Sequence, residues 1–277
     1  MKYCKKRWNI WTIRVIGSGN RKGGLLRDNK MKKIFVFLLL VVLFCAAPVF
    51  AFSAGLGNLN LPGYETVKKV SLYVVHRGVG DITNKPFDNM LGTDQGLITT
   101  YGFGFRITDW ADLSIMRSNL NQEFFVSNKI KIFDGFAFLW GVTNKTSPLI
   151  TQDKTNYVAQ LIFYEEIFKD KVAVTFVPTY SNFSPNRPTF AIGMGGNLQV
   201  AEKYGYLENI EILGEYTPAF GGYAFNGPEL SFGIRWNVLS QVMSLMITNA
   251  PFTFPNSYIL GNEDGVFHLG FNLSTEL

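Results

Sequence analysis

The feature that most constrains this fold is a set of segments in which apolar and polar residues alternate. In residues 229–238 every even position is apolar or aromatic, and every odd position is small, polar or charged. A β-strand points successive side chains to opposite faces of its sheet, so a period of two predicts strands whose faces meet different surroundings. The pattern recurs in residues 70–74, 101–107, 130–132 and 267–274.

The apolar face of these segments is unusually aromatic. The chain holds 25 Phe, and the opposite face carries Lys, Arg, Glu and His side chains. A transmembrane β-barrel places apolar residues against lipid and polar residues toward its lumen. The pattern therefore predicts an all-β fold, a closed antiparallel transmembrane β-barrel. Outward side chains are expected for Phe232, Trp236 and Phe271, and inward ones for Lys131 and Arg235.

We expect about twelve strands, most of them reaching the ~9–11 residues that a tilted strand needs to cross the hydrocarbon layer. Connections after even-numbered strands are short, and those after odd-numbered strands are mostly long, with residues 119–121 as the exception. Bacterial outer-membrane barrels have short periplasmic turns and longer external loops, so both termini are expected in the periplasm. The expected strands are residues 67–77, 95–107, 111–118, 122–133, 135–142, 155–165, 171–180, 189–199, 206–216, 229–238, 241–248 and 265–275.

Strand parity also assigns individual side chains to the lumen or to the membrane interface. Trp and Tyr favour the interface because one part of each ring system prefers water and the rest does not. The candidate aromatic girdle is Trp110, Trp140, Tyr157, Tyr180, Tyr206, Tyr216 and Trp236. The candidate lumen-lining residues are Lys69, Tyr73, Arg77, Arg106, Glu123, Lys129, Lys131, Gln160, Glu211, Glu215, Arg235 and His268, and Asn237 and Asn272 share their parity.

The charge is divided unevenly along the chain. Of 26 Lys and Arg, eleven lie in residues 1–51 beside one acidic residue, so residues 52–277 hold 15 basic and 20 acidic residues. This later part carries a formal net charge of −5. A nucleic-acid-binding surface is therefore not expected.

Residues 31–51 have the three parts of a secretory signal peptide. Met31-Lys32-Lys33 begins it, an apolar stretch follows, and small residues precede a cleavage site expected after Ala51. A permanent membrane helix is an alternative, since the stretch nearly reaches the roughly 20 residues required, but Pro48 favours processing. Cys45 follows Phe44, which is too large for a lipoprotein signal.

The leader divides the rest of the chain into parts. Residues 1–30 are interpreted as an extension from a start codon assigned too early, and residues 52–66 as a periplasmic N-terminal segment. The barrel is expected over residues 67–277. Cys4 and Cys45 both precede the mature chain, which therefore has no disulfide, thiolate metal site or cysteine nucleophile.

Three segments resemble a known family: Leu72 to Gly78, Phe87 to Asp94 and Tyr101 to Asp109. They are similar to an uncharacterised family of bacterial outer-membrane β-barrels, domain of unknown function 5777. The resemblance implies a secreted barrel in the outer membrane and assigns no reaction to any residue. Residues 78–80 depart from the aromatic and glycine that follow the His-Arg pair in this family.

Residue types suited to catalysis or metal binding are sparse. His76 and His268 are the two histidines of the chain, which lacks a histidine-pair zinc spacing. Oxygen ligands for calcium occur at Asp81, Asp88 and Asp94 and at Glu263-Asp264, but acidic loop residues are usually just solvated. We expect no metal and no cofactor. A lipid-acting enzyme would need a serine beside His76, and the sequence singles out no such serine.

The sequence thus predicts an integral outer-membrane β-barrel of a Gram-negative bacterium, without catalysis. It forms either a narrow porin-like channel for small solutes or a structural barrel whose opposite charges pair across the lumen. Its expected partners are outer-membrane lipid and the barrel-insertion machinery, and its oligomeric state is unassigned. The alternatives are the lipid-acting barrel enzyme and a soluble periplasmic β-sheet protein.

Overall fold

The computed structural model describes residues 58, 70–83, 90–144, 155–168, 171–182, 188–221, 227–239, 241–250, 252–255 and 266–277. All of them belong to one compact unit, Ala47–Leu277. The expected signal peptide and its cleavage site lie outside the described residues, as do Lys69 and most of the expected N-terminal segment. Among the described residues there is no helix of the length and apolarity needed to cross a membrane.

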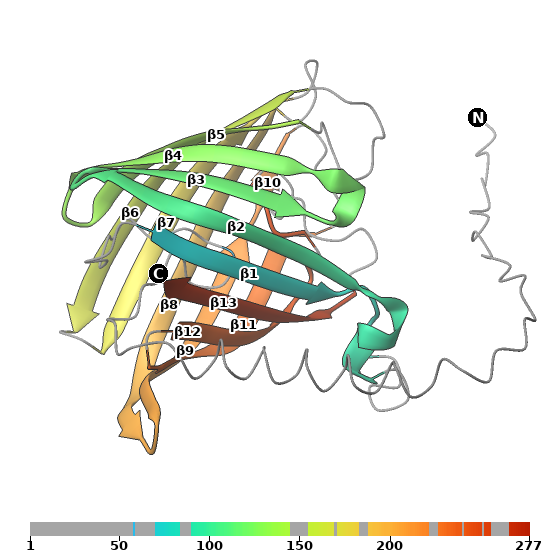
Figure 1. The fold of residues 1–277 in the computed structure, drawn as a ribbon, viewed down its shortest axis with the longest axis vertical. Coiled ribbons are helices and arrows are strands. Elements are labelled where there is room, and N and C mark those ends of the chain that lie inside the picture. The colour runs from blue at the N-terminus through green and yellow to red at the C-terminus, as the bar shows by residue number, and fades with distance from the viewer. Residues whose placement is uncertain are drawn as a thin grey trace, which may run out of the picture. The chain divides into compact units, whose positions relative to one another are not determined.

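The part of the chain that the structure describes contains thirteen strands and two short 3₁₀ segments (Figure 1). The 3₁₀ segments are η1 (Met90–Gln95) and η2 (Leu120–Gln122). The strands are β1 (Val70–Gly78), β2 (Leu97–Thr108), β3 (Ala111–Ser118), β4 (Phe124–Phe133), β5 (Phe136–Thr143), β6 (Asn156–Phe168), β7 (Val172–Ser181), β8 (Thr189–Tyr204), β9 (Leu207–Thr217), β10 (Ala219–Phe220), β11 (Glu229–Val238), β12 (Gln241–Thr248) and β13 (His268–Glu276).

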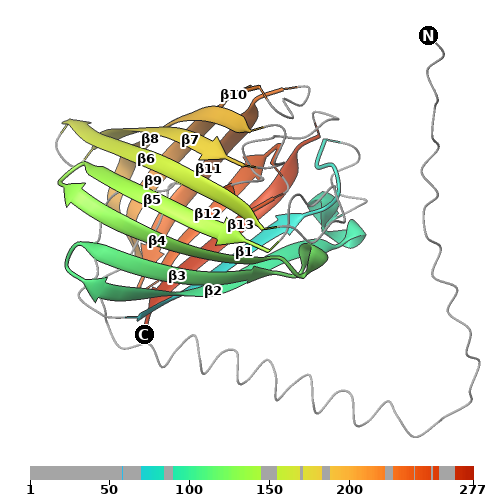
Figure 2. The same ribbon diagram turned by 90° about the horizontal axis from the view of Figure 1, so that it is seen from above.

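Twelve of the described strands close into a cylinder, which Figure 2 shows from above. Each of them pairs antiparallel with its neighbours around the ring, and β1 closes it against β13, with Arg77 opposite Gly270. Closure leaves no exposed sheet edge, which a lipid environment requires. The predicted all-β, closed antiparallel barrel of about twelve strands is confirmed.

The thirteenth strand, β10, corrects the prediction of a loop over residues 217–228. Its two residues pair with Phe190 and Ala191 of β8, beyond the end of β9. A strand of two residues is too short to show a period of two, which explains why the alternation did not reveal it.

Several strand bounds also differ from the expected ones. The strand expected over residues 189–199 continues to Tyr204, because the β8–β9 hairpin keeps pairing past an irregularity between Gln199 and Ala201. The last strand, expected over residues 265–275, is His268–Glu276.

The two rims of the barrel differ as the connection lengths predict. The rim that holds the turns after β2, β4, β6, β8 and β11 is called the short-turn rim, and the opposite one the long-loop rim. Register shifts lie close to the short-turn rim in the β2–β3, β4–β5, β6–β7 and β8–β9 hairpins. Gly135 and Gly205 occupy two of these turns with φ of 81° and 64°, a backbone conformation that favours glycine.

The barrel wall is apolar outside and largely polar inside. On β11, outward Phe232 is 57% exposed and inward Arg235 is 8% exposed. The same contrast holds on β7, where outward Phe176 is 41% exposed while inward Thr175 is 4% exposed. Large apolar side chains that face away from the barrel are expected in a protein surrounded by lipid.

Candidate functional site in the barrel lumen

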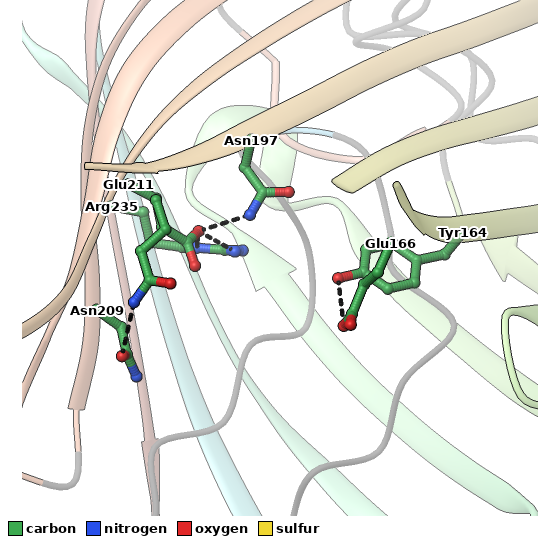
Figure 3. Close-up of polar contacts among 7 residues, drawn as sticks. Tyr164, Glu166, Asn197, Asn209, Glu211 and Arg235 are labelled. Carbon is green, nitrogen blue, oxygen red and sulfur yellow. Dashed lines mark hydrogen bonds and ion pairs between the residues drawn. The ribbon is translucent and has the colours of Figure 1, made fainter. Parts of the chain in front are cut away.

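One polar group joins three neighbouring strands inside the barrel (Figure 3). Arg235 of β11 and Glu211 of β9 form an ion pair, in which Arg235 Nε donates to Glu211 Oε2 at 2.8 Å. Asn197 Nδ2 of β8 donates to the same oxygen at 3.1 Å. Opposite charges therefore compensate each other along this part of the wall.

A second polar group surrounds Asn58, the described residue of the expected N-terminal segment. The Asn58 main-chain N–H donates to both carboxylate oxygens of Glu215, at 2.8 and 3.1 Å. Its side-chain Nδ2 donates to Glu229 Oε1 at 3.0 Å and to Ser231 Oγ at 2.9 Å. Arg77 Nη2 donates to Asn58 Oδ1 at 2.9 Å.

We call these residues, together with Thr248, the Asn58 cluster. Thr248 Oγ1 lies 3.4 Å from Asn58 Nδ2 and accepts a hydrogen bond from Ser231 Oγ at 2.8 Å. Glu229, Ser231 and Thr248 are fully buried, and Arg77 and Glu215 are 1% and 3% exposed. Two carboxylates and one guanidinium thus share a site from which water is largely excluded.

A third group of charges lies on the opposite side of the strand order, on β2, β3 and β4. Asp112 is the register partner of both Arg106 and Lys129, so one carboxylate stands between two cations. Tyr73 extends over the neighbouring β2 backbone, since a Cβ on Gly104 would lie 2.6 Å from the Tyr73 hydroxyl.

Four other residues predicted to line the lumen contact polar groups of nearby residues, and a fifth forms an ion pair at the short-turn rim. Gln160 donates to Thr179 Oγ1 at 3.0 Å, and Glu123 accepts from Thr143 Oγ1 at 2.7 Å. His268 Nδ1 lies 3.2 Å from the Gly80 carbonyl oxygen. Lys131 pairs with Asp134 at 2.5 Å in a turn of the short-turn rim. Asn272 Oδ1 accepts from Arg77 Nη1 at 2.7 Å.

One sector of the interior is apolar, which the polar-lumen prediction did not anticipate. Inward residues of β4 to β8 form a buried cluster with two residues of the loop after β12: Phe125, Ala137, Leu139, Val158, Ile162, Val177 and Ala191, with Ala250 and Phe254. Phe254 packs on Phe125 at 5.4 Å between ring centroids. Thr253 is held to Thr100 by a 2.6 Å hydrogen bond between their hydroxyls. The loop therefore fills part of the interior.

The candidate girdle residues lie near strand ends or in turns. Trp110 and Tyr206 occupy short-turn connections, and Trp236 lies near the same rim on β11. Tyr157, Tyr180 and Tyr216 lie one residue from the long-loop end of their strands, and Trp140 is three residues from that end of β5. Six of the seven are exposed by more than a third, and Trp236 is half-buried.

His76 faces outward near the long-loop rim. Its Nδ1 lies 3.0 Å from Thr99 Oγ1, and its ring stacks with Phe271 at 6.4 Å. The described residues contain no cluster of three or more His, Cys, Asp or Glu that could hold a metal ion. Asp81 accepts hydrogen bonds from Thr83 N at 2.8 Å and Oγ1 at 2.7 Å, which lower its pKa. Asp88, Glu263 and Asp264 lie outside the described residues.

Sequence reasoning missed Asn58, Glu229 and Asp112. Glu229 and Asp112 have inward strand parity, so the alternation carried the signal for both. Asn58 precedes all the strands that the structure describes, and its position in the sequence carried no such signal.

Three solved structures are similar to the chain at low TM-score and low sequence identity. NanC porin has a TM-score of 0.45 at 8% identity, covering 75% of this chain and 100% of its own. LpxR from Salmonella typhimurium has a TM-score of 0.42 at 10% identity, with the same two coverages. Omp33 from Acinetobacter baumannii has a TM-score of 0.41 at 12% identity, covering 76% of this chain and 98% of its own. No curated protein sequence matches the chain.

A family model described as a membrane-bound β-barrel domain, DUF5777, matches residues 137–277. The match covers the half of the chain after β4, whereas the resemblance noted in the sequence lies in residues 72–109. A membrane-bound family overturns the alternative of a soluble periplasmic sheet protein. The closed barrel, its apolar exterior and this match together establish that the chain belongs to the DUF5777 family of membrane-bound β-barrels.

Proposed function

We propose that this protein is an integral outer-membrane barrel that forms a narrow channel for small polar solutes and performs no catalysis. The observation that supports this function is the line of buried polar side chains on the inward faces of β1, β9, β11, β12 and β13. A polar interior behind an apolar, lipid-facing exterior is the arrangement of porin-type barrels, so these side chains form the wall along which we place the path.

The passage is narrow for two reasons. Barrels with open aqueous channels have roughly 16–18 strands, and barrels of about eight are filled by their own side chains. This barrel closes with twelve of its described strands, and the loop residues Ala250 and Phe254 fill the sector beside β4 to β8. Solutes would therefore pass along the polar wall. Since its charges pair locally, we expect weak ion selectivity.

The outer membrane of a Gram-negative bacterium is the proposed location. Bacterial barrels of this kind, with short turns on one rim and longer loops on the other, occupy that membrane. The expected leader would deliver the chain to the periplasm, where the barrel-insertion machinery would fold it into outer-membrane lipid.

Conductance of the purified protein in planar bilayers tests the channel. We expect discrete current steps in potassium chloride, with similar cation and anion permeability when each ion is substituted in turn. Heat-modifiable gel mobility would verify that the sample is a folded barrel. A folded barrel that passes no current would contradict the channel and leave a structural role.

The second candidate is a lipid-acting enzyme, favoured by the hydrogen bond between His76 and the Thr99 hydroxyl near the lipid-facing rim. A hydroxyl beside a histidine is the arrangement of an activated nucleophile. Among the described residues, no carboxylate contacts the ring to orient it. We expect the wild type and His76→Ala to hydrolyse phospholipid equally, at the background rate. Hydrolysis by the wild type that is lost in His76→Ala would favour the enzyme.

A further inference from the structure

The Asn58 cluster holds a single amide group within a shell of buried polar side chains. Building on the proposed channel function, we propose that this cluster is a binding site for small solutes that carry an ammonium group and an amide, such as amino-acid amides and short peptides. In this assignment Asn58 occupies the site and competes with the solute for it. Because Asn58 is part of the chain, we call it a tethered competitor.

The contacts of Asn58 define the chemistry of the ligand. One N–H is directed at Glu215, a primary amide N–H is directed at Glu229 and Ser231, and one carbonyl oxygen accepts from Arg77. A ligand must therefore offer two nitrogen donors and one acceptor within the length of a single residue. Sugars and simple alcohols offer hydroxyls but no donor pair of this kind.

The charge of the cluster favours a cation in place of the neutral asparagine. Glu215 and Glu229 bring two carboxyl groups to this largely water-excluded site, and Arg77 brings one guanidinium. An ammonium at the position of the Asn58 main-chain N–H would lie beside the Glu215 carboxylate. Its hydrogen bonds to the carboxylates would also be charge-assisted, and these are stronger than neutral ones.

Asn58 leaves the polar atoms of the cluster incompletely satisfied. Arg77 Nε is buried and has no hydrogen-bond partner among the described residues, so it could donate to the carbonyl oxygen of a ligand. Buried polar atoms are normally paired in native proteins, and exceptions mark sites for water, ions or ligands. An ammonium has three donors, so it could bind Glu215 and also reach a second acceptor in the cluster.

Calorimetric titration of the full chain in detergent micelles with β-alaninamide tests the site. This probe has an ammonium and an amide separated by two carbons, as are the main-chain nitrogen and side-chain amide of asparagine. The variant Asn58→Gly removes the side-chain contacts with Glu229, Ser231 and Arg77, so only the main-chain hydrogen bonds to Glu215 would hold residue 58 against a ligand. We expect it to bind β-alaninamide at least about tenfold more tightly than the wild type, because a tethered competitor lowers the competent fraction.

Two further substitutions in the Asn58→Gly background locate the binding. Glu229→Gln keeps the shape and removes the charge, and we expect it to weaken binding at least about tenfold. Glu166→Gln is the control, since Glu166 is not part of the Asn58 cluster and accepts a hydrogen bond from the Tyr164 hydroxyl on β6 (Figure 3). It should leave the affinity unchanged. Should Glu229→Gln fail to fold, as its gel mobility would reveal, Ser231→Ala replaces it.

Two further probes test which chemical groups of the ligand the site recognises. Propionamide lacks the ammonium and glucose lacks both groups, so each should bind at least about tenfold more weakly than β-alaninamide. No binding to Asn58→Gly, equal binding of glucose, or loss of binding with Glu166→Gln alone would overturn the proposal. Binding without bilayer current would contradict the channel and leave the site, whereas current without binding would contradict the site alone.

Discussion

Arg235 on β11 and Glu211 on β9 are register partners whose side chains meet inside the barrel wall. The side chains are 10% and 16% exposed, so water screens the pair only weakly. Asn197 adds a hydrogen bond to the same carboxylate oxygen from a third strand. This arrangement ties β8, β9 and β11 together where the β8–β9 hairpin pairs with the β11–β12 hairpin.

We predict that Arg235→Gln lowers the free energy of unfolding by about 2–3 kcal/mol, because Glu211 would remain charged and poorly solvated. Replacing both residues by apolar ones of similar size should recover most of the loss, since no unpaired charge remains. Denaturant unfolding in detergent measures both effects. Lys203→Gln is the control: its partner Glu208 is about half exposed, and exposed pairs contribute at most about 1 kcal/mol.

The outward face of β11 provides a test of lipid contact. Ile234 is 46% exposed, and its register partners Ile212 and Leu245 are apolar. We expect Ile234→Arg to destabilise the barrel in lipid vesicles by about 2–4 kcal/mol, as charges near the bilayer midplane do. In water an exposed substitution changes stability by no more than about 0.5 kcal/mol. Tyr206→Arg, in a turn, should show only that small change, and an equally small effect at Ile234 would argue against lipid contact.

A glycine on β2 permits close approach of the next strand. A Cβ on Gly102 would lie 2.5 Å from the Ile115 carbonyl oxygen and 2.8 Å from the Met116 Cα. Both are backbone atoms that cannot move aside cheaply, so Gly102→Ala should cost about 1–3 kcal/mol through overpacking. The matched substitution Gly227→Ala meets nothing within 4 Å and should be neutral. Denaturant unfolding curves of the two variants measure the effect. Equal losses of stability in both would show that the close spacing of β2 and β3 is not the cause.

The barrel wall was predictable because its cause is local. Each strand in a lipid-facing wall must alternate, and the alternation in residues 229–238 alone places Phe232 outside and Arg235 inside. Connection lengths likewise separated the two rims. Strand ends were less predictable, since pairing in the β8–β9 hairpin continues to Tyr204 past a register shift between Gln199 and Ala201.

The interior was less predictable because its contacts are not local. Asn58 binds residues between 19 and 190 positions away, and no periodicity connects them. Nothing in the sequence indicated what packs against the inward apolar residues of β4 to β8. For Phe125 the partner is Phe254, in a loop more than a hundred residues later in the chain. A period-two pattern records which face a residue is on but not what fills the space opposite it.

The inserted loop after β12 yields the last prediction. Phe254 is 1% exposed within the apolar cluster, whereas Phe252 of the same loop is half-buried and outside the cluster. Phe254→Ala should lower stability by about 3–5 kcal/mol through the cavity it leaves. It should also raise single-channel conductance, because the loop loses its anchor against Phe125. Phe252→Ala is the matched control and should change neither quantity appreciably. Unchanged conductance in a destabilised Phe254→Ala barrel would mean that the loop stabilises the interior without narrowing the path.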